Sequence, residues 1–478
     1  MEDANSNSQP AEEKKELVAR RFFVGALAAC ALVSIALYNG YPTVFSDTGS
    51  YLLTGKFLIA LPPFRAPGYA IFTKLTSFGI SAWFTIAVQA TMVVFVLYET
   101  CDYLTEGERR FADLYFLASV CVLTGLTSLP WLVSLLMPDV FAGLLFLSAF
   151  LLAFAEELKP IQRFVLAAIF TISIAAHASL LPISALFVMA AVILKLRQTN
   201  RAARAFPSTK SLLVWLLVPI LAAGIFTAAL NRQMGLGFRL SPSRNAFLLA
   251  RLFGDGLALD FLRANCPKEN FISCGYLSDL PQTQEEFLFR YPVSLYSKLK
   301  GHEDEMEKIV SGTIRAYPFR FAVSSAKETL LQLASLHTGD EIRSYGAREW
   351  NSNVIPLVFP GDFQAFQNGR EYRGRLTPLA DNAAALDAPI FWLSIVTCLL
   401  LARTGRFGRA NLFFYSALAY LAINAAICAT FAGVYDRYQE RVAWILPICL
   451  TAYVYCLARD WKRSEVTPEI EEWEAPVE

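Results

Sequence analysis

Charge is scarce in this sequence. Charged residues make up 17% of its 478 positions, whereas soluble globular chains carry about 25%. Lys+Arg total 42 and Asp+Glu total 41, which gives a formal net charge of +1. No basic field is therefore available to recruit nucleic acid, and we expect no nucleic-acid partner.

Several motifs of common enzymes are missing as well. The three histidines, His177, His302 and His337, form no H-x-x-x-H motif, and no paired C-x-x-C occurs, so a zinc hydrolase is unsupported. The absence of G-x-x-x-x-G-K-[ST] excludes an ATP-driven pump of the P-loop type. A G-x-S-x-G turn, which would present a nucleophilic serine, is also absent.

Long apolar runs, by contrast, are abundant. Hydrophobic residues make up 55% of the chain and the mean hydropathy is +0.41. Repeated apolar runs of about 20 residues predict an all-α polytopic membrane protein with about ten transmembrane helices. The predicted spans are 22–40, 81–98, 112–128, 140–155, 164–179, 180–194, 211–230, 388–402, 411–432 and 441–458.

Basic residues flank alternate ends of these runs, which predicts the orientation. The clusters are Lys14/Lys15/Arg20/Arg21, Arg109/Arg110, Lys159/Arg163, Lys195/Arg197/Arg201/Arg204, Arg403/Arg406/Arg409 and Lys462/Arg463. By the positive-inside rule, both termini are cytoplasmic and the first run is a signal anchor in the plasma (inner) membrane. All these basic clusters lie on the cytoplasmic side only if the apolar stretch 164–193 crosses the membrane twice. We therefore predict a hairpin of two short helices that turns near His177 to Pro182, instead of one long helix.

The predicted topology divides the chain into five parts. They are a cytoplasmic tail (1–21), a transmembrane core with the first outer loop (22–230), an extracytoplasmic domain (231–387), the last transmembrane helices (388–460) and a second cytoplasmic tail (461–478). The outer domain reads as mainly helical, with amphipathic stretches at 244–263 and 303–337 and an irregular region at 350–376. On an oxidising face Cys266 and Cys274 form a disulfide; the alternative is two free thiols.

Ionisable residues at the outer membrane boundary are the candidates for chemistry, because a charge there must be paired, hydrated or used. Asp47 follows the first span directly, and it is either a helix N-cap before Thr48 or a catalytic base. Arg65 lies in a segment interrupted by prolines that we expect at the interface, where it either reaches lipid headgroups or binds a phosphate.

Three further positions share that boundary. Asp139 opens the fourth span and is either a cap or a ligand-orienting acid. His177, at the predicted hairpin turn, is either structural or a donor to phosphate. Arg437 and Arg441, in the segment that opens the last span, either pair with neighbouring acids or bind an anion on a face otherwise poor in basic residues.

The order of these features resembles the GT-C class of integral membrane glycosyltransferases, in the branch of protein mannosyltransferases and aminoarabinose transferases. Members carry an acid in the first outer loop and then a basic, proline-containing segment, to which Asp47 and Arg65-Ala-Pro67-Gly-Tyr69 are similar. An Asp opening the fourth span matches Pro138-Asp139, a basic residue near the outer end of span five matches His177, and an Arg-Tyr…Pro pattern near the last spans matches Arg437-Tyr438…Pro447. Many relatives have Asp-Glu where this chain has Asp47-Thr48.

The resemblance implies a polyprenyl-phosphate-linked sugar as donor and a glycan, lipid or protein as acceptor, with no cofactor. Asp47 would be the base, and Arg65, His177 and Arg437 would hold the phosphate. Asp139 would orient the acceptor, and Tyr69 and Tyr438 would contact substrate. No metal ligand is predicted, and a divalent metal is left open. Two other functions fit the same groove: a transporter or flippase of lipid-linked sugars, and a non-catalytic envelope assembly factor.

Overall fold

The computed structural model describes residues 9–59, 65–106, 109–197, 209–266, 268–290, 292–340, 342 and 349–466. Within these ranges every regular element is a helix, and the one β-bridge joins Thr43 and Leu135. The predicted all-α class is therefore confirmed. Parts of the predicted basic loops and tails, including Arg201 and Arg204, lie outside the described residues.

Five described helices have the length and apolar composition to cross a membrane, which supports a membrane protein. They are α5 (Ala82–Leu104), the run Leu213–Gln233 formed by η2 (Leu213–Leu217) and α12 (Val218–Gln233), α21 (Thr377–Ala402), α22 (Gly408–Ala432) and the run Asp436–Lys462 in α23 (Asp436–Ala443) and α24 (Ile445–Val466). The other predicted spans coincide with α1 (Gln9–Leu32), α2 (Ser34–Asn39), α6 (Arg109–Leu126), α8 (Val140–Phe154), α9 (Pro160–Ala176) and α10 (Leu180–Arg197).

The apolar stretch 164–193 is two helices, as predicted. Helix α9 ends at Ala176, His177 has extended backbone angles, and α10 begins at Leu180. The Leu180 amide donates to the His177 carbonyl at 3.0 Å across the turn. His177 therefore lies at a helix junction instead of in the middle of one long helix.

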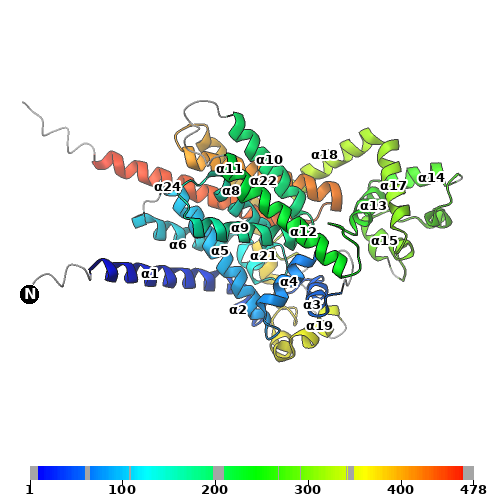
Figure 1. The fold of residues 1–478 in the computed structure, drawn as a ribbon, viewed down its shortest axis with the longest axis horizontal. Helices are drawn as coiled ribbons and strands as arrows, with labels where there is room; N and C mark the ends of the chain where they lie inside the picture. Colours follow the sequence, from blue (N-terminus) through cyan, green and yellow to red (C-terminus); the bar gives the residue numbers. More distant parts are fainter. Residues whose placement is uncertain are drawn as a thin grey trace, which may run out of the picture.

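The core surrounds α8, which lies in the middle of the bundle (Figure 1), and all fifteen of its residues are buried. Gly143 lets the Trp444 ring approach α8, and the Tyr420 hydroxyl donates to the Ala142 carbonyl at 2.6 Å. On the outside of the bundle η2 exposes Leu217, and α12 exposes Leu221 and Ile225. Apolar side chains facing outward are expected where lipid is the solvent.

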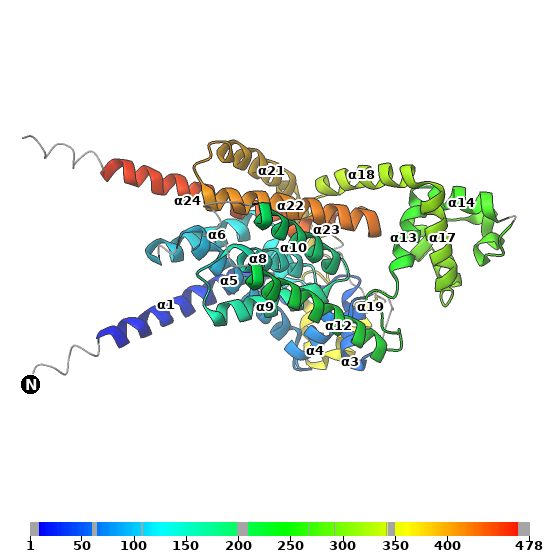
Figure 2. The same ribbon diagram turned by 45° about the horizontal axis from the view of Figure 1, so that its top comes forward.

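A separate helical unit projects from one end of the bundle, and α1 and α24 protrude from the opposite end (Figure 2). We call residues 244–334 the outer unit. It has its own buried core and contains α13 (Arg244–Gly254), α14 (Leu257–Asn265), η3 (Ile272–Asp279), α15 (Gln284–Phe289), α16 (Leu295–Leu299), α17 (Glu303–Ala316) and α18 (Pro318–Ala334). The predicted helical content of this segment is confirmed.

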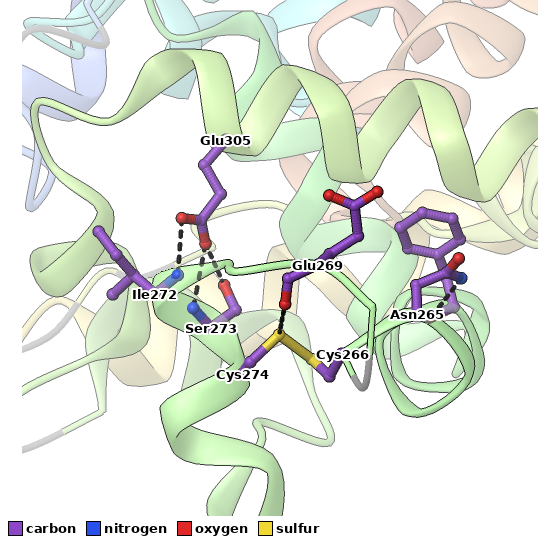
Figure 3. Close-up of a disulfide and its surroundings, with 8 residues drawn as sticks. Asn265, Cys266, Glu269, Ile272, Ser273, Cys274 and Glu305 are labelled. Carbon is purple, nitrogen blue, oxygen red and sulfur yellow. Dashed lines mark hydrogen bonds between the residues drawn. A yellow bond between two sulfur atoms is a disulfide. The ribbon is translucent and has the colours of Figure 1, made fainter.

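The predicted disulfide is also present. Cys266 and Cys274 are joined in the outer unit, and Figure 3 shows the bond beside Glu305 of α17. The Glu305 carboxylate accepts from the Ile272 and Ser273 amides at 2.8 and 3.0 Å, which fixes the start of η3. The disulfide and this carboxylate together order a stretch that has little apolar core of its own.

The region 350–376 is more regular than predicted. It forms α19 (Trp350–Val358), η4 (Pro360–Asp362) and α20 (Phe363–Asn368). Val354 and Ile355 are buried in a small core with Tyr41 and Leu52, and this burial stabilises the helix despite Pro356. The expectation of an irregular region was wrong because tertiary packing outweighs the local composition. The predicted boundary at 387 falls inside α21.

Candidate functional site

Asp47 lies at the start of α3 (Thr48–Phe57), where its side chain makes no capping hydrogen bond. Its carboxylate instead pairs with two guanidinium groups from distant parts of the chain. Arg65 Nη2 bonds to Oδ1, and Arg437 Nη1 lies 3.4 Å from Oδ2. The three side chains keep 13%, 17% and 14% of their surface exposed, for Asp47, Arg65 and Arg437 respectively. The structure therefore disfavours the cap interpretation of Asp47 and brings three predicted site residues into contact.

The loop that carries Asp47 is held by buried polar contacts. Asn351 of α19 accepts from the Gly49 amide at 2.8 Å and donates to the Phe45 carbonyl at 2.7 Å. The Glu371 carboxylate accepts from the Val44 amide at 3.1 Å. Burial raises the pKa of Glu371 well above its ordinary value, and the Val44 amide opposes the rise. This loop is positioned from a segment 300 residues away, so the sequence offered no local signal for it.

Arg437 comes from the first turn of α23, which is fixed by the outer unit. The Gln332 amide group of α18 donates to the Tyr435 carbonyl at 2.7 Å and accepts from the Tyr435 N–H at 2.9 Å. The Arg437 guanidinium lies 4.7 Å from the Phe45 ring centre and 5.1 Å from the Tyr438 ring centre. These aromatic faces hold the cation beside Asp47.

Arg441, one turn further along α23, is completely buried. Its Nη2 donates to Ser179 Oγ, Asn424 Oδ1 and Cys428 Sγ at 3.0, 2.9 and 3.1 Å. Its Nε and Nη1 have no hydrogen-bond partner in the described part of the chain. A buried guanidinium with open donors and no carboxylate bonded to it is costly unless an anion binds there.

Asp139 lies in the same neighbourhood. It occupies the N-cap position of α8 without a capping side-chain bond, it is buried, and its Oδ1 has no partner within the described ranges. The charge of Asp139 acts electrostatically on Arg437 and on Tyr51. The cap interpretation of Asp139 therefore has no hydrogen bond to support it, and its open oxygen can accept from a bound group.

His177 and Tyr438 border the arginines. The His177 and Tyr438 ring centres are 6.3 Å apart, and His177 Nδ1 lies 2.9 Å from the Ser179 hydroxyl that also accepts from Arg441. His177 feels the positive charges of Arg441, Arg437 and Arg65. Both predicted residues thus lie beside the arginines of α23.

Two further tyrosines of this region, Tyr69 and Tyr51, have different surroundings. Tyr69, at the start of α4 (Pro67–Thr76), is fully buried and its hydroxyl donates to Gln89 Oε1 at 2.9 Å. Tyr51, whose ring centre is 5.2 Å from that of Tyr69, feels the charges of Asp47, Asp139 and the arginines. Tyr51 was not among the predicted site residues, although its position four residues after Asp47 places it on the same helical face.

We call Asp47, Arg65, Asp139, His177, Arg437 and Arg441 the charged cluster. No group of three or more His, Cys, Asp or Glu side chains in the described residues is arranged to hold a metal ion. The guanidinium groups of the charged cluster can bind an anionic ligand, and its carboxylates can accept a proton.

Comparison with protein-family models, with curated proteins and with solved structures finds no match for this chain. The chemistry of the charged cluster is therefore the basis for assigning a function.

Proposed function

We propose that the protein is a membrane glycosyltransferase that moves a sugar from a polyprenyl-phosphate donor to an acceptor at the extracytoplasmic face. We further propose a GT-C-like arrangement with ten spans, with both termini cytoplasmic in the inner membrane. The outer unit and the two ends of the described chain lie at opposite ends of the molecule (Figure 2), which supports this orientation. The Cys266–Cys274 disulfide supports an oxidising outer face.

The observation that carries the proposal is the pairing of Asp47 with two arginines at the end of an apolar bundle. The three arginines of the charged cluster outnumber its two carboxylates by one positive charge. A lipid-linked phosphodiester carries one negative charge and would neutralise this excess. Its isoprenoid chain would remain in the membrane, so the enzyme would need no nucleotide pocket.

Donor binding also frees the base. A donor phosphate would compete with the Asp47 carboxylate for Arg65 and Arg437, because both ligands are anionic oxygens that bind guanidinium groups. Arg441, with its open N–H groups, would add further bonds to the phosphate. Asp47 would then lose its partners at the moment when the substrate is in place.

The transfer step follows from this exchange. The released Asp47 carboxylate takes the proton of the acceptor hydroxyl while that oxygen forms a bond to the anomeric carbon. The bond from this carbon to the phosphate oxygen breaks and its electron pair leaves with the polyprenyl phosphate, so the anomeric centre is inverted. The arginines stabilise the second negative charge that develops on the phosphate. Asp139 orients the acceptor, and the outer unit selects a glycan, lipid or protein.

The test is Asp47→Asn in the purified full chain, assayed with polyprenyl-phosphate hexose or pentose. We expect transfer to fall by at least about a hundredfold, which is the usual contribution of a general base. Asp113→Asn is the matched control, because Asp113 is also a buried carboxylate paired with an arginine (Arg20, 3.0 Å). Full activity in Asp47→Asn would refute the base. If the protein instead moves the lipid-linked sugar across a vesicle membrane without transferring the sugar to an acceptor, it is a carrier.

A further inference from the structure

Glu440 of α23 is linked to a second buried carboxylate, that of Asp387, through the hydroxyl group of Thr338. Glu440 is 4% exposed, and its Oε1 lies 3.4 Å from Thr338 Oγ1. The same hydroxyl lies 2.9 Å from Asp387 Oδ1 of α21, and the Thr338 amide donates to Asp387 Oδ2 at 2.6 Å. Two carboxyl groups thus converge on one hydroxyl group.

The hydrogen atoms available do not satisfy both acids. The Thr338 hydroxyl has one hydrogen, and its shorter contact is with Asp387. Glu440 Oε2 is buried and has no hydrogen-bond partner in the described part of the chain. If Glu440 were ionised, it would hold a negative charge out of water with only the hydroxyl groups of Thr338 and Ser128 to stabilise it and with nothing bonded to Oε2 in the described residues. A proton on Glu440 removes this conflict, because the carboxyl O–H then donates to the Thr338 oxygen.

The charges around Glu440 oppose its ionisation, because Asp387 and Asp436 both act on it, whereas His337 favours ionisation of Asp387. The titratable groups that act on the pair are Asp436 of α23 itself and His337 beside Thr338. The two arginines on α23 bind elsewhere: Arg437 pairs with Asp47, and Arg441 donates to Ser179, Asn424 and Cys428. Helix α22 faces α23 with the neutral Asn424, whose side chain donates to the Tyr438 carbonyl at 2.6 Å. The last turn of α18 faces it with the neutral Gln332.

We propose that Glu440 binds a proton in this structure and shares it with Asp387 through Thr338, and that loss of the proton drives α23 away from α21. Arg437 and Arg441 lie within one turn of Glu440 on the same short helix, so this movement would displace the guanidinium groups of the charged cluster. The carboxyl pair of Glu440 and Asp387 is then a proton switch next to the charged cluster. This inference stands on the packing of α23 and does not depend on which reaction the cluster performs.

The test is the melting temperature of the full chain in detergent between pH 6 and pH 9, for wild type, Glu440→Gln and Asp387→Asn. If the folded state holds a proton that the unfolded chain has released, stability falls as pH rises. Glutamine mimics the neutral acid, so this part of the fall disappears in Glu440→Gln, with a difference of about 2–4 °C from wild type at pH 9. Asp387→Asn removes the neighbouring charge and reduces the fall as well.

Glu99→Gln is the matched control, because Glu99 is also a buried acid but its oxygens accept from Gln162 at 2.8 Å, and it should not remove this part of the fall. The proposal is overturned if Glu440→Gln and Asp387→Asn keep the wild-type dependence on pH. It is also overturned if added sodium chloride, but not equimolar choline chloride, restores the wild-type melting temperature at pH 9, since that result would make the pair a cation site. Loss of transfer in Asp47→Asn leaves both outcomes unaffected, so the two proposals fail separately.

Discussion

Gly68 lies where α4 meets α9, and replacing it with alanine tests the placement of the site. A methyl group at this position would lie 2.1 Å from the Ala175 carbonyl oxygen and 2.4 Å from its carbon. Ordinary contacts begin at 3.4 Å, so the two backbones would have to separate by about 1.3 Å. The obstacle is backbone and not a flexible side chain, and it therefore cannot move aside alone.

Overpacking of this kind costs about 1–3 kcal/mol, and a backbone clash places Gly68→Ala at the upper end of that range. We expect the melting temperature of the purified chain to fall by roughly 2–3 °C. Because Gly68 adjoins Tyr69 and Ala175 precedes His177 by two residues, the separation would also widen the charged cluster and lower the proposed transfer activity. Small residues at close helix contacts are characteristic of membrane bundles.

The matched control is Gly125→Ala on α6, where a methyl group would meet nothing within 4 Å. Alanine is favoured over glycine in a helix by up to about 1 kcal/mol, so this variant should melt at or above the wild-type temperature. Thermal unfolding of both variants in the same detergent, followed by size-exclusion chromatography, gives the comparison. Equal melting temperatures for Gly68→Ala and Gly125→Ala would refute the contact between α4 and α9.

Two predictions concern the outer unit. Burial, helped by the Asp255 carboxylate and opposed by Arg251, raises the pKa of Glu328 to about 7. Because the folded state raises the pKa of this acid, its stabilising contribution is present at low pH and is lost as pH rises through about 7. Hydrogen exchange in α18, corrected for intrinsic rates, should therefore be faster at pH 8 than at pH 5. Glu328→Gln should remove this difference. Replacing Cys266 and Cys274 by serine opens a loop with a sequence separation of 8 and should destabilise the outer unit by about 2–3 kcal/mol. Limited proteolysis should then cut between these positions, and an uncut loop would contradict the estimate.

Much of the helical fold followed from the sequence because a bilayer leaves few alternatives. An apolar run in lipid must satisfy its backbone hydrogen bonds internally, so each run predicts a helix. The hairpin near His177 was predicted from the parity of the basic loops, and the structure has the break between Ala176 and Leu180. The pairing of Cys266 with Cys274 followed from their short spacing.

The partners of the charged side chains did not follow from the sequence. Asp47 and Asp139 were each open to a cap interpretation, and only the structure shows that neither caps its helix through its side chain. The open donors of Arg441 and the position of Tyr51 among four charges depend on packing between helices far apart in the chain.

The sequence by itself determined which apolar runs are helical, where the run near His177 breaks and which ionisable residues are costly at a membrane boundary, because these are local consequences of hydropathy and turn chemistry. Only the tertiary structure decided that Arg437 pairs with Asp47 across 390 residues and that Glu440 faces Asp387. Such pairings depend on the relative rotation and depth of the helices, which are set by close contacts such as Gly68 against Ala175 and Gly143 against Trp444.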